Sequence, residues 1–452
     1  MKLINYPVIG HPGGTVVSRH SANFFSPFIP LSDFSFNFTG PNYFSPLHRN
    51  KKKKKKNKNH QSPPSVSLHR VSALVEDGCL HRLCYALRHC LHLIRKVMEL
   101  ESNTTGRGGG GGRGMSKSTK KVLLIVNCIL LSLGSACGPL VLRLYFLKGG
   151  KGVWISAGLE TAGWPFVLVA LLASYLYRRR ANGPGPEPTK VSFITWRLFL
   201  ASAVLGLLTG LDDYLYASGV SYLPVSTSSL IIASQLAFTA VFAFLLVKQK
   251  FTAFSVNAVF LLCLGAGVLA MHASGDKPAN ETKGQYFLGF FMTVGAAVLY
   301  GFVLPAIELT YSKARQNVTY TLVMEMQMVM SLFATLFNVV GMIFHHEIQT
   351  MPKEASEFEL GKVGYCMVLI ATALVWQCFF VGAVGVVSCG SSLLSGVLIA
   401  TFLPVTEILA VFIYHEPFGA EKAIALVLSI WGFISYFYGE YKHTKKSTHT
   451  AE

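Results

Sequence analysis

The chain contains a long succession of apolar segments, each about as long as a membrane-spanning helix. About 20 apolar residues are needed to cross the hydrocarbon core of a bilayer as a helix. With 51% hydrophobic and 14% charged residues, the composition excludes a soluble globular domain. The sequence therefore predicts an all-α integral membrane protein with ten transmembrane helices, at about 122–147, 153–177, 196–217, 223–247, 254–273, 285–308, 320–344, 363–386, 391–413 and 420–440.

A pattern within these segments recurs at about half their total length. Ser228-Ser229-Leu230 returns as Ser391-Ser392-Leu393, 163 residues later, and Gly265 returns as Gly432, 167 residues later. Internal repetition in an apolar chain is typical of transporters built from structural repeats, with the substrate site between the repeats near the bilayer midplane. We expect two pseudo-symmetric halves, at about 121–273 and 285–441.

Residues 1–114 differ in composition from the rest of the chain. They contain the runs Lys51–Lys56 and Gly108–Gly112, and their 17 basic and 5 acidic residues give a net charge of +12. Residues 115–452 carry 23 basic and 17 acidic residues, a net charge of +6, so the basic excess of the tail does not indicate nucleic-acid binding. We expect a disordered, low-complexity tail. It is interpreted as a misassigned start ahead of Met115 or, alternatively, as an organelle transit segment.

Basic residues are distributed unequally between the two sets of connectors. With the first span starting inside, fifteen Lys and Arg residues lie on the inner side and eight on the outer side. The positive-inside rule then places both termini in the cytosol. We expect a multi-pass protein of the plasma membrane.

Acidic side chains inside membrane spans are costly, so each is a candidate for function. Glu160 and Glu325 lie in the second span of each half, 165 residues apart, and are predicted to bind substrate or protons. A carboxyl group buried at the midplane could take a proton from an acidic outside and release it in the cytosol. The alternative is a neutral hydrogen-bond partner that ties helices together. Asp212 is a further candidate, although one of Asp212 and Asp213 could face water or cap the next helix.

Aromatic and amide side chains occur at helical spacing near these acids. Trp164, which with a following proline interrupts the second span, comes four residues after Glu160 and is expected to share its helix face. A cavity lined by indole, phenyl, amide and carboxyl groups suits a flat, heteroaromatic solute that forms hydrogen bonds. Ordinary helix packing is the alternative for each aromatic residue. The predicted substrate-binding residues are Trp164, Asp212, Gln235, Phe238, Glu325, Trp376, Gln377 and Phe380, and the predicted proton-coupling residues are Glu325 and Glu160.

Several motifs resemble those of the plant purine permeases. They include Leu159–Pro165 (LETAGWP), Asp213–Ala217 (DYLYA), Ser221–Leu230 (SYLPVSTSSL), Trp376–Phe380 (WQCFF) and Leu403–Ile408 (LPVTEI), and the match covers residues 121–441 in order. The resemblance implies the fold of the drug/metabolite transporter superfamily, with two inverted five-helix halves. It also implies proton-coupled uptake of adenine, cytokinins or related purine-like bases.

Two positions depart from the family pattern, which commonly has Gln at the position of Glu160 and Asn at that of Asp213. Because relatives commonly have Gln in place of Glu160, Glu325 is the favoured candidate for the proton-coupling residue.

Other functions remain open at this point. A carrier on the same fold could transport an alkaloid, a vitamin B6 compound or a nucleotide sugar, although a phosphate-bearing solute calls for basic residues deep in the spans, and Arg143 alone lies within one. An intramembrane enzyme is the alternative of another class. No phosphate-binding GxxxxGK motif occurs in the sequence. We expect a carrier and not an enzyme, with no metal or cofactor, whose partners are a small-molecule substrate, protons and the lipid bilayer. A homodimer is one open oligomeric state.

Overall fold

The computed structural model describes residues 117–181, 192–222, 232, 234–272, 283–314, 316–414 and 419–449. Every regular element within these ranges is helical. All of them belong to one compact unit, Pro64–Glu452. The predicted tail, residues 1–114, lies outside the described residues.

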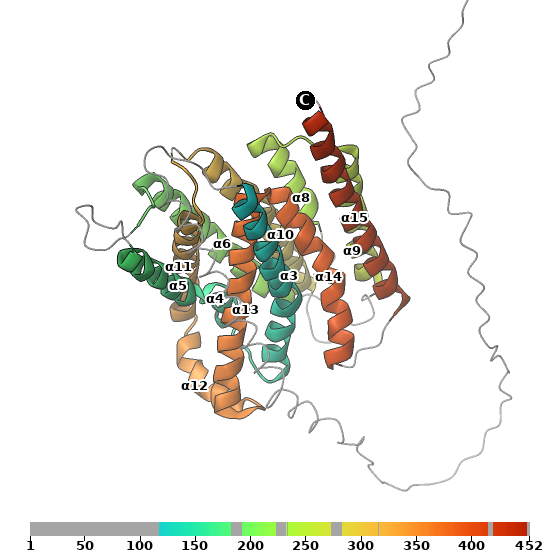
Figure 1. The fold of residues 1–452 in the computed structure, drawn as a ribbon. Helices are drawn as coiled ribbons and strands as arrows, with labels where there is room; N and C mark the ends of the chain where they lie inside the picture. Colours follow the sequence, from blue (N-terminus) through green and yellow to red (C-terminus); the bar gives the residue numbers. More distant parts are fainter. Residues whose placement is uncertain are drawn as a thin grey trace, which may run out of the picture. The chain divides into compact units, whose positions relative to one another are not determined.

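The helices follow the predicted apolar segments. Within the described ranges, eight helices are long and apolar enough to cross a membrane, and two shorter apolar helices, Gln235–Val247 and Ala253–Gly265, cover parts of the predicted fourth and fifth segments. The chain is therefore an all-α, multi-pass membrane protein. In chain order (Figure 1) the helices are α3 (Lys117–Leu147), α4 (Val153–Thr161), α5 (Trp164–Ala181), α6 (Trp196–Tyr222), α8 (Gln235–Phe242), the π-helical η3 (Ala243–Val247), α9 (Ala253–His272), α10 (Lys283–Ser312), α11 (Tyr320–Phe344), α12 (Glu347–Glu357), α13 (Gly361–Cys389), α14 (Ser392–Tyr414) and α15 (Ala420–His449).

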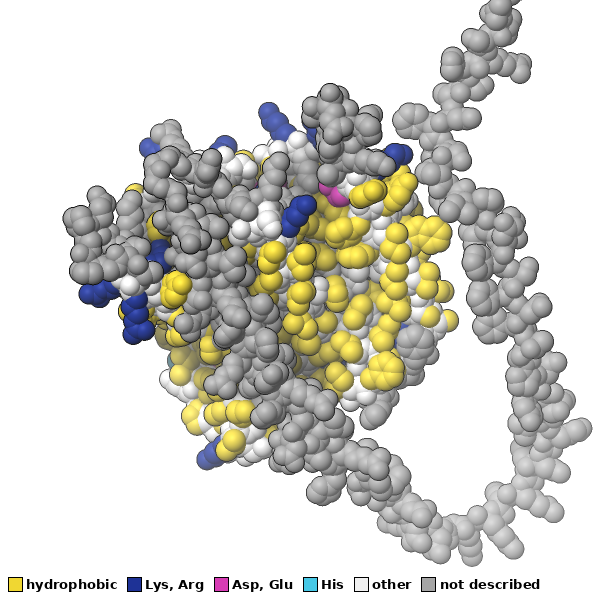
Figure 2. All heavy atoms as spheres, in the orientation of Figure 1, with side chains coloured by type: hydrophobic (Ala, Val, Ile, Leu, Met, Phe, Trp, Pro, Cys, Tyr) yellow, Lys and Arg dark blue, Asp and Glu magenta, His cyan; other side chains and the backbone are white. Residues whose placement is uncertain are grey.

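The outward faces of these helices are apolar. Val169, Phe260 and Phe412 are each more than 60% exposed. Figure 2 shows hydrophobic side chains gathered on the part of the visible face where Figure 1 places α14 and α15. A surface of this kind suits contact with lipid tails, because a helix satisfies its own backbone hydrogen bonds and exposes only side chains.

Glycine residues let the backbones of two pairs of helices come into direct contact. On α3, a Cβ atom added to Gly134 would lie 2.5 Å from the backbone of Phe379 on α13. On α6, a Cβ atom added to Gly206 would lie 2.9 Å from the Cα of Met330 on α11. Packing through small residues is typical of membrane helices, where association depends on close van der Waals contact.

The main helix partners are distant in sequence. α3 packs along α13, α6 packs against α10 and α11, and α9 packs along α15. α4 packs against both α6 and α11. Helices from the two predicted halves therefore interleave within the bundle.

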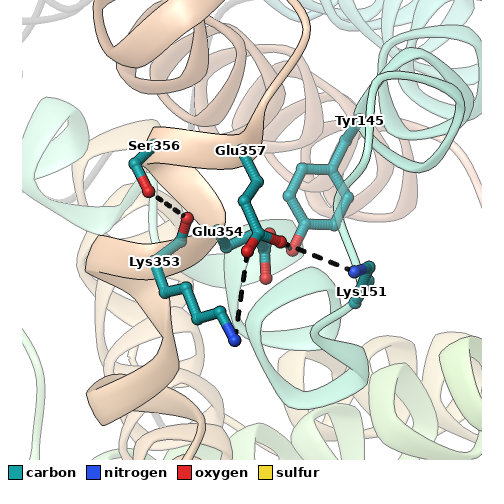
Figure 3. A network of polar contacts seen from close by, with 6 residues as sticks. All are labelled: Tyr145, Lys151, Lys353, Glu354, Ser356 and Glu357. Atoms are coloured by element: carbon teal, nitrogen blue, oxygen red, sulfur yellow. Dashed lines mark hydrogen bonds and ion pairs between the residues drawn. The ribbon is translucent and has the colours of Figure 1, made fainter.

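The short helix α12 marks one end of the bundle, which we call the α12 end. Tyr145, near the end of α3, donates a hydrogen bond from its hydroxyl to Oε1 of Glu354 on α12, at 2.5 Å. Figure 3 shows this contact beside Glu357, which pairs with Lys151 and Lys353 at 3.8 and 3.9 Å. The ion pairs of Glu357 are exposed, whereas Glu354 is buried, so Glu354 is the main anchor of α12.

The opposite end of the bundle is marked by basic residues at the end of α5, and we call it the Arg178 end. Arg178, Arg179 and Arg180 form the last turn of α5 there. The Arg178 guanidinium lies 4.8 Å from the ring centre of Phe193, in the segment that leads into α6.

Candidate functional site

Three buried carboxyl groups lie close together where α4 packs against α6, and we call them the acid cluster. Glu160, Asp212 and Asp213 are 3%, 7% and 2% exposed. Glu160 interacts electrostatically with Asp212 and with Asp213. One oxygen of each residue has no hydrogen-bond partner among the described residues. Neither aspartate faces water, which was one of the alternatives open from the sequence, because both are buried on α6, against which α4, α10 and α11 pack.

Polar side chains from three helices surround the acid cluster. Tyr216 of α6 and Tyr300 of α10 lie within electrostatic reach of the carboxyl groups. Asn338 of α11 lies beside Asp213 and is fully buried. Asn338 is not among the residues predicted from the sequence, although an amide in an apolar span is the same signal that singled out Gln235 and Gln377. Nothing distinguished Tyr300 from the packing residues around it.

The second predicted span is broken beside the acid cluster. α4 ends at Thr161 and α5 begins at Trp164, as the Trp164-Pro165 motif predicts, since proline is well suited to the first turn of a helix. Because the helix is interrupted between them, the four-residue spacing no longer establishes that Glu160 and Trp164 share a face; Glu160 is buried and Trp164 is half-buried. Broken helices near the midplane supply backbone groups to substrates and ions in many transporters.

The break packs directly against α13 at a predicted site residue. A Cβ atom added to Gly163 would lie 2.6 Å from the carbonyl oxygen of Ala373 and 2.9 Å from Oε1 of Gln377. Gln377 is 4% exposed, and neither atom of its amide has a hydrogen-bond partner among the described residues. The structure therefore places a buried amide with free hydrogen-bonding capacity against the helix break.

An aromatic group on α13 joins this region to the acid cluster. Tyr300 stacks with Phe379 at a ring-centre distance of 6.0 Å. Phe379 in turn contacts the predicted site residues Trp376 and Phe380 edge to face, each at 5.2 Å. Trp376 and Phe380 are both buried, and the indole Nε1 of Trp376 has no hydrogen-bond partner among the described residues. The aromatic group and the acid cluster thus meet at Tyr300.

The two predicted residues of α8 lie along the same stretch of α10. Phe238 packs against Ala297, one turn before Tyr300. Gln235 begins α8, is half-buried, and presents its backbone carbonyl towards Gly301. α8 therefore brings both residues to the part of α10 that reaches the acid cluster.

Glu325 lies in a different place. Its carboxylate accepts hydrogen bonds from the backbone N–H of Phe193 at 2.8 Å, from that of Ile194 at 2.9 Å and from Oγ of Ser192 at 3.1 Å. Asn338 lies thirteen residues farther along α11, and a rise of about 1.5 Å per residue puts about 20 Å between Glu325 and the acid cluster. The structure does not bring Glu325 together with Glu160.

No group of three or more His, Cys, Asp and Glu side chains in the described part of the chain is arranged to hold a metal ion. The site instead offers carboxyl, amide, phenol and aromatic groups. A bundle of membrane-crossing helices with a broken helix and a buried polar centre is typical of membrane transporters.

Comparison with known proteins gives the family. A family described as purine nucleobase transmembrane transport matches residues 122–446. The chain is 52% identical over 322 residues to purine permease 3 of Arabidopsis thaliana, covering 71% of this chain and 92% of that protein. It is 49% identical over 339 residues to purine permease 2 of the same plant, covering 73% and 94%. The chain belongs to the plant purine permease family, whose members are transporters and not enzymes.

A solved structure shares the fold. A crystal structure described only as that of a protein aligns with a TM-score of 0.51 at 17% identity, over 71% of this chain and 96% of the other. At this identity the likeness concerns the helical fold alone.

Proposed function

We propose that this chain is a proton-coupled carrier of purine nucleobases and of purine-like compounds such as cytokinins. The observation that supports the proposal is the acid cluster, which sits against a broken helix and an aromatic group in a member of a purine transport family. Carboxyl and amide groups can pair with the ring nitrogens of a base, and aromatic rings can stack on its face. A phosphate-bearing solute such as a nucleotide sugar fits less well, because three carboxyl groups would repel it.

The proposed architecture has ten spans in two inverted halves of five. Taken in chain order, the halves pair α3 with α10, α4–α5 with α11, α6 with α13, α8 with α14 and α9 with α15. When the two halves are exchanged by this pairing, the contact between α3 and α13 becomes the contact between α10 and α6, which the structure also has. The contact between α9 and α15 is unchanged by the exchange, because these two helices are each other's counterparts. This correspondence supports a pseudo-two-fold axis, and an odd number of spans in each half makes the second half inverted.

The proposed orientation places the α12 end outside and both termini in the cytosol of a plasma-membrane protein. The basic residues Arg178–Arg180 at the opposite end support it, because cytosolic connectors carry an excess of Lys and Arg.

The proposed mechanism rests on repulsion within the acid cluster. Several like charges so close together in a site closed to water are unfavourable, so Glu160 and Asp212 would take up a proton when the site opens to an acidic outside. A protonated carboxyl group can donate a hydrogen bond to a base nitrogen, while Gln377 pairs with the ring edge and Trp376 and Phe380 stack on its face. Rocking of the halves would then open the site to the cytosol, where the proton and the base leave.

The predicted proton role of Glu325 competes with that of Glu160. The three hydrogen bonds that Glu325 accepts at the Arg178 end favour an anchoring role for this residue. The unpartnered oxygen and the acidic neighbours of Glu160 favour a proton-binding role. We therefore place the proton on Glu160 and Asp212, and Glu325 remains the alternative.

Uptake of labelled adenine and trans-zeatin into transport-deficient cells, at acidic and neutral outside pH, tests the proposal. The wild type should accumulate more substrate at acidic pH, and Glu160→Gln and Asp212→Asn should each remove this stimulation. Glu359→Gln, at an exposed position, is the control. Uptake of labelled pyridoxine, without uptake of adenine or trans-zeatin, would show that the substrate is a vitamin B6 compound and not a purine base.

The same assay separates the two glutamates. We expect Glu325→Gln to lower the amount of folded protein but to keep the ratio of uptake at the two pH values. Accumulation by the wild type that ignores outside pH would contradict proton coupling altogether. Loss of the pH ratio in Glu325→Gln, with the ratio kept in Glu160→Gln, would move the proton to Glu325.

A further inference from the structure

α11 carries a stripe of uncharged polar side chains along one face. Gln327, Ser331, Thr335 and Asn338 are separated by four, four and three residues, so they lie above one another on the helix. Gln327 and Ser331 are 1% exposed and Asn338 is fully buried. Buried polar groups in a membrane span are costly, so a whole row of them calls for an explanation.

The members of this polar stripe contact one another. Nε2 of Gln327 donates to Oγ of Ser331 at 2.8 Å, and Oγ1 of Thr335 donates to the carbonyl oxygen of Ser331 at 2.7 Å. Thr372 of α13 and Thr401 of α14 make the same kind of bond as Thr335, to carbonyls of their own helix four residues earlier. Self-bonding of that kind is the ordinary use of a hydroxyl in a membrane helix. The stripe differs from them in the additional side-chain bond between Gln327 and Ser331.

The polar stripe meets the acid cluster at the end of the stripe formed by Thr335 and Asn338. The hydroxyl of Thr335 lies 3.3 Å from that of Thr161, the neighbour of Glu160 on α4. Asn338 lies beside Asp213. From Asn338 the stripe runs about 16 Å towards the Arg178 end before it reaches Gln327, which is about half the thickness of the hydrocarbon core.

The polar stripe also keeps unused hydrogen-bonding capacity. Oε1 of Gln327 has no hydrogen-bond partner among the described residues, and the amide of Asn338 has none there apart from the carboxyl group of Asp213 beside it. Side chains that merely tie helices together normally use their buried donors and acceptors. An unused oxygen at Gln327 and an amide at Asn338 that faces the acid cluster instead suit a chain of hydrogen bonds that forms with water during transport.

We propose that the polar stripe, together with Thr161, is the path by which protons leave the acid cluster towards the Arg178 end. The proposal rests on the proton coupling proposed above. Along the path, the hydroxyls of Ser331 and Thr335 each accept a proton on one side and release their own on the other, and the amides of Gln327 and Asn338 hold water in line. In each transfer one O–H bond forms on the accepting oxygen and one O–H bond on the same oxygen breaks, so one proton moves along the path and no other covalent bond changes.

The packing on one flank of the stripe excludes a path for the base between α6 and α11. α6 approaches α11 at backbone distance over the same stretch, at Gly206 against Met330 and at Gly210 against Ala334. No planar ring fits between these two helices, whereas a proton requires only neighbouring hydrogen-bonding groups.

The test uses the purified full chain in proteoliposomes with labelled adenine. Accumulation driven by a pH gradient requires net proton movement, whereas counterflow exchange at equal pH on both sides does not. In the double variant S331A/T335V, gradient-driven accumulation should fall on the order of tenfold or more, while counterflow is kept. Thr335→Ser keeps the hydroxyl and should retain both activities. Thr372→Val removes a buried hydroxyl that bonds to its own helix as Thr335 does but lies outside the stripe, on α13, and it is the matched control.

Each other outcome counts against the polar stripe. Gradient-driven accumulation that survives in S331A/T335V and in Gln327→Leu would overturn the proposal. Loss of counterflow together with accumulation, in protein that remains monodisperse in detergent, would assign the stripe to the substrate and overturn it as well. If the double variant does not fold, Ser331→Ala alone must show the same split between the two activities. A wild type whose accumulation ignores the pH gradient would instead show that proton coupling itself fails.

Discussion

At the residue scale, the buried and half-buried carboxyl groups of this protein occupy two kinds of surroundings. Glu347 accepts hydrogen bonds from the backbone N–H groups of Trp154 and Ile155 at the start of α4, at 3.2 and 2.9 Å. Glu308 accepts one from Ser392 at the start of α14, at 2.6 Å. Helix starts favour negative charge because their first N–H groups lack partners within the helix. Glu325 accepts backbone N–H groups of the segment just before α6, whereas one oxygen of each carboxyl group in the acid cluster has no partner among the described residues.

The cap made by Glu347 leads to a stability prediction. Glu347→Ala leaves two backbone N–H groups at the start of α4 without an acceptor, so we expect a loss of about 1–2 kcal/mol in the free energy of unfolding. A lower melting temperature in detergent, followed by tryptophan fluorescence, would show it. Glu359→Ala breaks only the partly exposed ion pair with Lys148 and should change stability by about 0.5 kcal/mol or less. Equal melting temperatures for the two variants would contradict the capping role.

At the element scale, the spans and the break in the second one could be predicted, because both follow from local sequence. Apolar length gives the spans, and the Trp164-Pro165 pair gives the helix start after the break. The partners of each helix could not be predicted in the same way. α3 finds α13 through Gly134 and Gly138, whose contacts with Phe379 and Trp376 join residues more than 230 positions apart.

The close approach of α3 and α13 can be tested at one glycine. In Gly134→Ala the new methyl group would meet the backbone of Phe379, which cannot move without shifting a helix, so we expect a destabilisation of about 1–3 kcal/mol and reduced uptake. Gly284→Ala, in α10, meets nothing within 4 Å and is the control. Because alanine favours a helix over glycine, the control should be neutral or up to about 1 kcal/mol more stable. Thermal unfolding of both variants in the same detergent decides the matter, and equal losses would contradict the packing.

At the scale of the whole molecule, the family match begins at residue 122, close to the first described helix at Lys117. We predict that a chain starting at Met115 keeps the uptake of the full chain, because the packed helices and the proposed site lie after that residue. Uptake of labelled adenine, divided by the amount of tagged protein at the cell surface, measures this. Loss of uptake at equal surface amount would show that residues 1–114 contribute to transport.

The sequence by itself determined the membrane class, the helical spans, the family and most candidate residues, because hydrophobic length and local motifs are written along the chain. Only the tertiary structure decided which acids belong together. Glu160 and Glu325 occupy matching places in the sequence repeat, yet one lies in the acid cluster and the other holds the segment before α6. The physical reason is that the surroundings of a carboxyl group are supplied by helices distant in sequence, whose packing no local pattern records.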